Sequence, residues 1–184
     1  MGKSDLHQAL RRITSLLDEA GIPYAIVGAL ALGQYGYRRL TEDVDILLTT
    51  EGLARFKTLH LGRGYVEKFP GSRGLRDTEL GIPIDVVVAG DFPGDGKPKP
   101  VAFPDPSTLA QRGKDVAVVP LATLIELKLA SGISAPHRLR DLADVLELIR
   151  SARLSRELEA SLDPYVRGKY RELWEAAQGS APEP

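Results

Sequence analysis

The sequence contains no cysteine, which excludes disulfide bonds, thiolate metal sites and cysteine nucleophiles together. It also has no long apolar run, because its longest stretch without a polar side chain, residues 25–33, is far shorter than the roughly 18 residues that a membrane helix needs. Residues 1–5 lack the apolar segment of a secretory signal. These absences predict a cytoplasmic protein with no membrane contact.

An excess of either charge is also missing, since 24 Lys and Arg stand against 25 Asp and Glu for a formal net charge of -1. Without an overall basic field, any contact with a nucleic-acid backbone must be local. The 184 residues are 43% hydrophobic and 27% charged, which is ordinary for one globular domain. Composition therefore excludes a disordered, collagen-like or coiled-coil chain.

Apolar periodicity predicts an α/β (α+β) fold: a small mixed β-sheet flanked by helices and followed by a helical C-terminal region. We expect a single domain over residues 1–178, with the sheet in about 1–120, helices in about 121–178, and a flexible tail at 179–184. Five prolines and two glycines make residues 91–106 an irregular loop, either an ordered excursion or a mobile lid. Helices are predicted at about 4–20, 29–35, 52–60, 121–131, 138–150, 155–162 and 164–178, and strands at 24–27, 44–48, 65–69, 84–88 and 116–119.

Two acidic residues stand at the start of the strand predicted at 44–48. Alternation along the strand places Asp43 and Asp45 on the same face. At about 5 Å and an effective dielectric of about 20, their repulsion is on the order of 3 kcal/mol, which a hard cation such as Mg²⁺ would relieve. The alternative is that both are ordinary exposed acids beside a turn.

A third carboxylate, Asp85, interrupts the apolar strand predicted at 84–88, where a charge is costly without a partner. If this strand lies beside the strand of Asp43 and Asp45, the three carboxylates converge into a site for two metal ions, the arrangement used in nucleotidyl transfer. The alternative is that Asp85 caps the strand after Pro83.

Two further features suggest phosphate binding. Gly28 stands between a predicted strand and helix, where a phosphate can approach the backbone, although a plain tight turn also explains it. Lys128 lies on the apolar stripe of helix 121–131, either as a ligand for a triphosphate or with its stem packed and its ammonium in water. The basic segment 62–76 would serve an acceptor's phosphates or form a solvated loop.

Gly28-Ala29 followed after a spacer by Asp43-x-Asp45 resembles the signature of the DNA polymerase β-type nucleotidyltransferase superfamily. The resemblance extends over about residues 24–149. Additional residues are similar to those of its toxin-like branch, which occurs in type IV toxin-antitoxin and abortive-infection systems: Arg39, Thr41, Lys128, Arg140, Asp141 and Asp144.

The resemblance implies a role for each matching residue. Asp43, Asp45 and Asp85 would be catalytic metal ligands, and Lys128 and Asp141 would also act in the active site, Asp141 by positioning Lys128 or the acceptor. The implied nucleotide contacts are Gly28, Ala29, Arg39, Thr41 and Lys128. Ala29 departs from the family pattern, in which Gly or Ser is usual, so that only its backbone N–H can serve a phosphate. Asp144, near the start of its predicted helix, is interpreted as a complement to the helix dipole.

The implied function is an Mg²⁺-dependent nucleotidyltransferase, or one using Mn²⁺ in its place, that moves a nucleoside monophosphate from ATP or another NTP to a hydroxyl. The toxin-like branch implies RNA as acceptor, such as the tRNA 3′ end, and a cognate antitoxin protein as partner. An antibiotic-type small molecule or a protein is an alternative acceptor. Ala29 and the balanced charge also leave open a noncatalytic nucleotide-sensing or partner-binding module, and coincidental acids in a structural domain are the last alternative.

Overall fold

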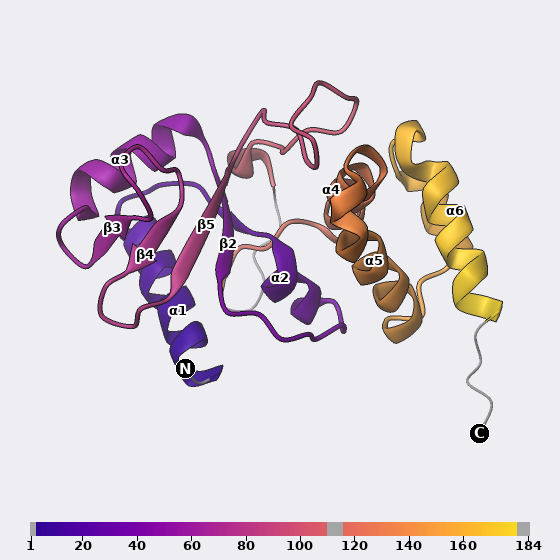
Figure 1. Cartoon of the computed structure of the whole chain (residues 1–184), viewed down its shortest axis with the longest axis horizontal. Coiled ribbons are helices and arrows are strands. Elements are labelled where there is room, and N and C mark those ends of the chain that lie inside the picture. Colours follow the sequence, from indigo (N-terminus) through magenta and orange to yellow (C-terminus); the bar gives the residue numbers. More distant parts are fainter. Residues whose placement is uncertain (1–2, 110–115, 180–184) are drawn as a thin grey trace. The chain divides into compact units, whose positions relative to one another are not determined.

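The computed structural model describes residues 3–109 and 116–179, which form two compact units (Figure 1). The first unit contains the chain up to Ala31, Arg39–Gly90 and Pro104–Val119. The second contains Leu32–Arg38, Asp91–Phe103 and the chain from Pro120 onward. The tail predicted at 179–184 lies, apart from its first residue, outside the described residues.

A five-stranded mixed sheet forms the centre of the first unit, in the order β1-β2-β5-β4-β3. Strands β2 and β5 pair in parallel, whereas the other neighbouring strands are antiparallel. This confirms the predicted fold class. Its strands are β1 (Ala25–Ile26), β2 (Val44–Leu48), β3 (Tyr65–Glu67), β4 (Leu75–Asp77) and β5 (Pro83–Val88).

Two helices, α1 (Lys3–Glu19) and α3 (Thr50–His60), cover one face of this sheet. The ring of Phe56 on α3 packs edge-on against Tyr65 of β3 at 5.2 Å between centroids, and Arg12 of α1 reaches Asp77 of β4. Tyr65 and Asp77 are register partners, so their side chains share a face. Thr49 caps α3 by accepting a hydrogen bond from the Gly52 N–H at 2.9 Å.

Register places the predicted acidic residues on the opposite face of the sheet. Leu75 of β4 shares the face of Asp77 and pairs with Ile84 of β5, so the next residue, Asp85, points the other way. Asp85 is in turn the register partner of Asp45 on β2. The parallel pairing of β2 and β5 therefore brings together carboxylates that are 40 residues apart in the sequence.

The predicted and observed strands differ at two places. β4 was not predicted, because it is only three residues long and has a charged residue at two of its three positions. The edge strand predicted at 116–119 is a single bridge between Val118 and Ile26 of β1, although the carbonyl of Ala117 accepts a hydrogen bond from the Ile26 N–H at 2.8 Å. The short 3-10 helix η1 (Pro106–Thr108) ends the loop that precedes it.

Helices α4 (Leu121–Ser134), α5 (Leu139–Ser151) and α6 (Pro164–Gly179) pack against one another in the second unit (Figure 1). They are linked by the 3-10 helices η2 (Pro136–Arg138) and η3 (Arg156–Ser161). The segment predicted as an α-helix at 155–162 is therefore mostly 3-10 helix. The side chains buried within this unit include Leu124, Ile125, Val145, Leu148, Val166 and Tyr170.

The proline-rich segment 91–103 is fastened by its own contacts. The ammonium of Lys99 donates to the carbonyl of Pro93 at 2.8 Å and to Asp95 Oδ1 at 2.7 Å. A Cβ on Gly94 would stand 2.2 Å from Ser134 Oγ, so this part of the loop lies directly against α4. The loop is an ordered excursion that contacts α4.

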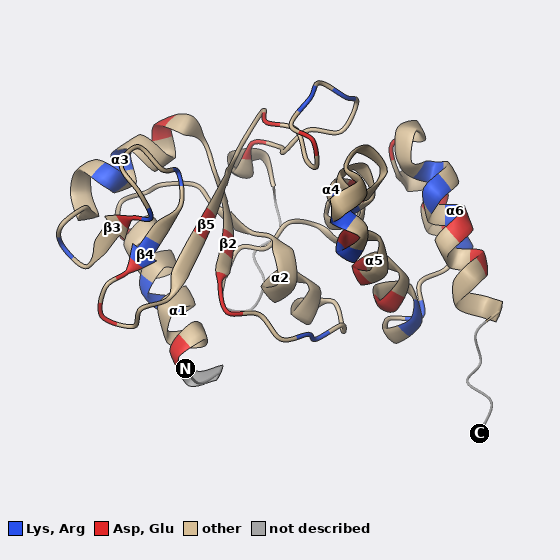
Figure 2. Ribbon diagram, viewed as in Figure 1, with Lys and Arg blue, Asp and Glu red and all other residues tan. Residues whose placement is uncertain are grey.

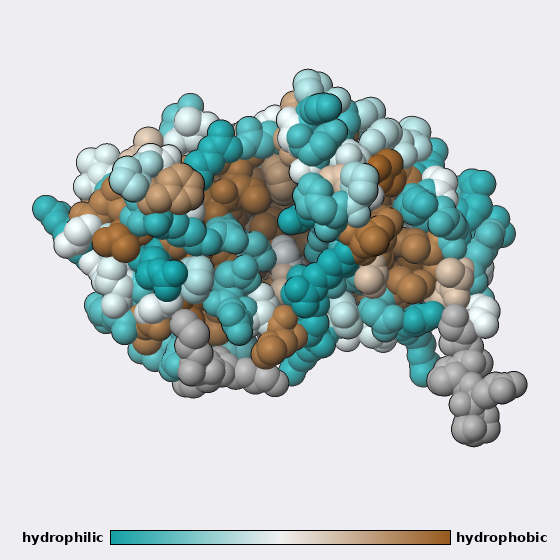
Figure 3. Space-filling model, in the orientation of Figure 1, coloured by the Kyte–Doolittle hydropathy of each residue, from teal (hydrophilic) through white to brown (hydrophobic). Residues whose placement is uncertain are grey.

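Exposed apolar side chains are interleaved with polar ones on the face seen in Figure 3, where brown side chains over β3 alternate with teal ones. Val66 on β3 and Phe69 just after it are 41% and 66% exposed. Scattered exposure of this kind is normal for a protein surface. No described helix is both long enough and apolar enough to cross a membrane.

Candidate functional site

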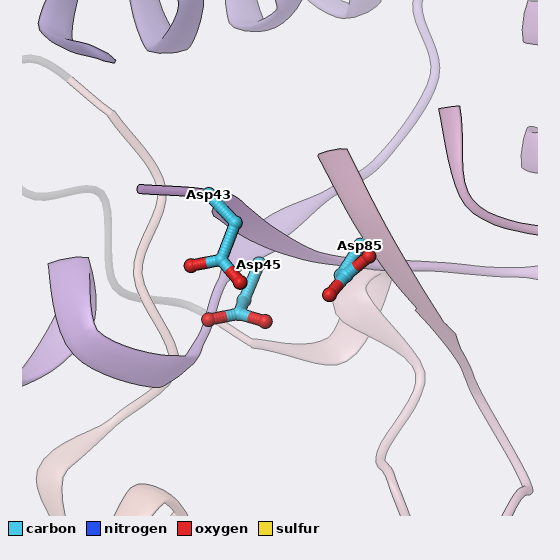
Figure 4. A group of neighbouring side chains, drawn as sticks. All are labelled: Asp43, Asp45 and Asp85. Atoms are coloured by element: carbon cyan, nitrogen blue, oxygen red, sulfur yellow. The ribbon is translucent and has the colours of Figure 1, made fainter. Parts of the chain in front are cut away.

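Three carboxylates of the first unit converge on the sheet face opposite α1 and α3. Asp43 lies just before β2, Asp45 lies on β2, and Asp85 lies on β5. Each offers one oxygen, and these oxygens all lie within 4.8 Å of one another (Figure 4). In Figure 2 acidic residues fall on β2, on β5 and on the segment leading into β2. The structure therefore brings together the three carboxylates that the sequence singled out.

Two neighbours orient this carboxylate cluster. The Thr41 hydroxyl donates a hydrogen bond to Asp43 Oδ1, and the Lys68 ammonium pairs with Asp85 Oδ1. The side chain of Asp85 is nonetheless 44% exposed. At an effective dielectric between about 20 and 80, each pair of carboxylates at this separation repels by about 1–3 kcal/mol. Hard oxygen donors crowded in this way suit a divalent cation, so the residues present fit Mg²⁺ or Mn²⁺.

Gly28 is required by the position of Asp45. Its φ of +63° is unfavourable for residues with a Cβ, and a Cβ built on it would stand 1.9 Å from Asp45 Oδ2. The Val27 N–H donates to the backbone carbonyl of Asp45 at 3.1 Å, which holds the two segments together. The tight turn and the close approach of a carboxylate both explain this glycine, and its predicted phosphate contact stays a prediction.

Helix α2 (Gly28–Gln34) begins at this turn. Ala29, its second residue, is 4% exposed, so its methyl group is packed within the protein. Arg39 lies in the loop between α2 and β2, where its guanidinium donates to the Leu40 carbonyl at 3.3 Å. The assignment of Ala29, Arg39 and Thr41 to the nucleotide stays a prediction.

Lys68 is a residue of the site that sequence reasoning did not assign. It follows β3, and its N–H donates to the Gly74 carbonyl at 3.0 Å across the hairpin that joins β3 and β4. A Cβ on Gly74 would stand 2.9 Å from Lys68 Cδ, so Gly74 leaves the space through which the lysine stem reaches Asp85. The sequence signal was weak, because Lys68 was one of several basic residues in segment 62–76.

Lys128 and Asp141 belong to the second unit, where they form a buried polar cluster with Asp144. The Lys128 ammonium donates to Asp141 Oδ1 at 2.9 Å and to Asp144 Oδ2 at 2.8 Å. The Ser131 hydroxyl and the Arg138 Nε–H donate to Asp141 Oδ2 at 2.7 and 2.9 Å. Lys128 therefore does not extend its ammonium into water, which excludes the snorkelling alternative. Its role toward a nucleotide stays a prediction.

The electrostatics of this cluster favour the ionised form of Asp141. Burial alone would raise the pKa of Asp141, but the Lys128 charge, the hydrogen bonds from Ser131 and Lys128 and the Arg138 charge outweigh it and hold this pKa below its ordinary value. Asp144 lies beyond the first turn of α5 and pairs directly with Lys128, so its interpretation as a complement to the helix dipole is wrong. Spacing offered a signal, because Asp141, Asp144 and Leu148 lie on one helical face.

No family model matches the sequence, and no curated protein matches it. Among solved structures, the chain is similar to ANT(2'')-Ia in complex with adenylyl-2''-tobramycin, with 14% identity, a TM-score of 0.57 and coverage of 90% of this chain and 96% of that chain. A solution structure of the antibiotic-resistance factor ANT(2'')-Ia matches at 16% identity, 97% and 95% coverage and a TM-score of 0.49. A proposed nucleotidyltransferase from H. pylori has 15% identity, the same two coverages and a TM-score of 0.49.

The likeness to ANT(2'')-Ia extends over nearly the whole of both chains, and it shows a shared fold. The chain therefore has a nucleotidyltransferase fold with a C-terminal helical part, as the resemblance in sequence implied. The toxin-like branch stays a prediction, as do the roles of the individual residues.

Proposed function

We propose that this protein is a divalent-metal-dependent nucleotidyltransferase that transfers a nucleoside monophosphate from an NTP to a hydroxyl acceptor and releases pyrophosphate. The observation that supports this most directly is the carboxylate cluster of Asp43, Asp45 and Asp85, whose oxygens lie within 4.8 Å of one another on the paired strands of a nucleotidyltransferase fold. The mutual repulsion of three like charges at this separation is what a bound cation would relieve.

The three carboxylates of the cluster would hold Mg²⁺, or Mn²⁺ in its place. When bound, the metal ion supplies charge neutralisation for the triphosphate and for the departing pyrophosphate. Thr41 fixes the rotamer of Asp43 through its hydrogen bond, and Gly28 gives Asp45 the space to face the cluster.

Asp85 forms an ion pair with Lys68, and its side chain is 44% exposed. A partly exposed carboxylate of this kind can be reached by an acceptor and is suited to accept the proton of an incoming hydroxyl. In this step the acceptor oxygen forms a bond to the α-phosphorus, the bond to pyrophosphate breaks, and the proton passes to Asp85. Lys68 would then position Asp85 through their ion pair.

The resemblance to the toxin-like branch supports RNA as acceptor, with a tRNA 3′ end as the specific case. Such an activity would halt translation, and the protein would then need a cognate antitoxin as partner. The likeness to ANT(2'')-Ia, whose complex holds adenylyl-2''-tobramycin, supports a second candidate, a small hydroxylated molecule. In both cases Lys128 would contact the nucleotide and Asp141 would hold Lys128 in position.

The test is a transfer assay with Mg²⁺, each labelled ribonucleoside triphosphate in turn, and either total cellular RNA or aminoglycosides. The control is the Asp43→Ala, Asp45→Ala double variant, with folding confirmed by circular dichroism. We expect label on one acceptor class with the wild type only, and ATP as the first donor to try. Metal-dependent NTP binding without transfer would direct the search to a protein acceptor. Absence of both transfer and binding would favour a noncatalytic module and refute the proposal.

A further inference from the structure

A groove of about 460 Å³ lies in the first unit, lined by α1, the end of α3 and the start of β3. Three arginines line it, Arg11 and Arg12 from α1 and Arg63 from the turn between α3 and β3, together with His60 and Tyr65. Tyr65 shares a sheet face with Asp77, opposite the face that carries Asp85. The groove is therefore separate from the carboxylate cluster.

The charge of this groove is only partly neutralised. Arg12 pairs with Asp77 at 3.0 Å and with Glu79 at 2.5 Å. Neither Arg11 nor Arg63 forms an ion pair with any residue that the structure describes. Two guanidinium groups therefore remain available to an anion, and a guanidinium matches two oxygens of a phosphate or carboxylate at once.

Two buried polar atoms at the base of the groove also lack partners. Within the described parts of the chain, Tyr65 Oη and His60 Nε2 have no partner at full hydrogen-bond geometry, although Tyr65 is only 1% exposed and the Arg12 guanidinium lies near enough to its hydroxyl to lower the Tyr65 pKa against the larger effect of burial. Such atoms are uncommon in folded proteins, because each costs the desolvation of a polar group. Burial raises the pKa of Tyr65 to about 12. Burial also lowers the pKa of His60, and the nearby Arg63 charge lowers it further, whereas the Glu19 charge acts in the opposite direction. Near pH 7 the phenol is a donor, and the neutral imidazole carries one N–H donor.

The turn that presents Arg63 is tightly built. Gly62 and Gly64 on either side of it have φ of +74° and +103°, a region that side chains rarely adopt. The Gly62 N–H donates to the Tyr65 carbonyl at 2.9 Å, and the Arg63 N–H donates to the His60 carbonyl at 3.0 Å. These bonds fix the backbone of Arg63 at the edge of the groove, where its charge acts on His60.

We propose that this groove binds a phosphate group, with Arg11 and Arg63 contacting its charged oxygens and Tyr65 and His60 donating hydrogen bonds at its base. All four groups can donate hydrogen bonds, so the groove favours an anion that only accepts them. Together they offer more donors than a single carboxylate accepts, which favours a phosphate over a carboxylate. The phosphate belongs either to a free small anion or to an oligonucleotide end, and the groove exceeds the size of phosphate alone. This inference does not depend on the proposed catalytic function.

Binding is measured by isothermal titration calorimetry with inorganic phosphate and, separately, with a 5′-phosphorylated oligoribonucleotide. Sodium chloride keeps the ionic strength the same in all titrations. EDTA is present throughout, so that the carboxylate cluster holds no metal. The variants are Arg63→Gln and Tyr65→Phe. The controls are Asp45→Asn and Arg55→Gln, the latter removing an exposed arginine of α3 that lies outside the groove.

We expect saturable binding that weakens about ten-fold in Arg63→Gln and several-fold in Tyr65→Phe, and that both controls leave unchanged. Tyr65→Phe should remain nearly as stable as the wild type, because the hydroxyl that it removes makes no hydrogen bond of full geometry. Tighter binding of the oligoribonucleotide than of phosphate would assign the site to a nucleic-acid end, and the reverse to a free anion. Absence of saturable binding, or equal binding by the wild type, Arg63→Gln and Tyr65→Phe, would overturn the proposal.

Discussion

Substitution of Gly28 by alanine should damage the carboxylate cluster more than the backbone. The backbone cost is the strain of an alanine at φ +63°, about 1–2 kcal/mol. The added Cβ would also lie 1.9 Å from Asp45 Oδ2 and 2.6 Å from its Cγ, so the carboxylate must move by roughly 1 Å or more to restore normal contact. Overpacking of this kind costs a further ~1–3 kcal/mol.

Gly21 is a matched control, because its φ is +62° and nothing lies within 4 Å of its built Cβ. We expect Gly21→Ala to lower the free energy of unfolding by about 1–2 kcal/mol and Gly28→Ala by about 2–5 kcal/mol in urea denaturation followed by circular dichroism. Mn²⁺ affinity, measured by calorimetry, should fall at least about ten-fold in Gly28→Ala alone, since only this change displaces a cluster carboxylate. Equal losses of stability, with wild-type Mn²⁺ affinity in both variants, would refute the reasoning.

Three further predictions concern the lysines and their carboxylates. Lys128→Met should lower the free energy of unfolding by about 3–5 kcal/mol in urea denaturation, because it leaves Asp141 and Asp144 buried without a cation; a loss below 1 kcal/mol would contradict this. The folded-state pKa of Asp141 lies below its ordinary value, so the stability that this group contributes should be present above about pH 4 and lost as the pH falls through the folded pKa. Asp141→Asn should therefore make the free energy of unfolding less dependent on pH in the acid range. An Asp141→Asn variant with the same pH profile as the wild type would contradict this prediction. Lys68→Met should raise Mn²⁺ affinity several-fold, because it removes a positive charge from Asp85, and Arg55→Met should leave the affinity unchanged.

The carboxylate cluster could be predicted from the sequence because its signals are local. Alternation in β2 puts Asp43 and Asp45 on one face, and a charge within the apolar strand β5 marks Asp85 as unusual. The sequence did not predict that β2 pairs with β5 and so brings Asp45 next to Asp85; it predicted only that the carboxylates would converge if the two strands were neighbours. The resemblance to a family made that condition plausible.

Other parts of the fold and site depend on contacts that no local pattern encodes. The ion pair between Lys68 and Asp85 spans 17 residues and requires the turn of a hairpin whose second strand, β4, is too short to show alternation. Asp144 was misinterpreted because its position near a helix start has a common explanation, whereas its burial depends on how α4 packs against α5. Gly28 was singled out by its place between a strand and a helix, but its tight constraint comes from a side chain 17 positions away.

The two lysines that pair with candidate site residues differ in how readily they release their carboxylates. Lys68 and Asp85 have side chains that are 29% and 44% exposed, and an ion pair at such a position contributes about 1 kcal/mol or less, so an incoming cation can replace the ammonium. Lys128 and Asp144 are 8% and 2% exposed, and separation of such a pair leaves uncompensated buried charge at a cost of several kcal/mol. Any contact of Lys128 with a nucleotide must therefore be made while Lys128 keeps its carboxylates, because only the first pair is weak enough for a bound ligand to break.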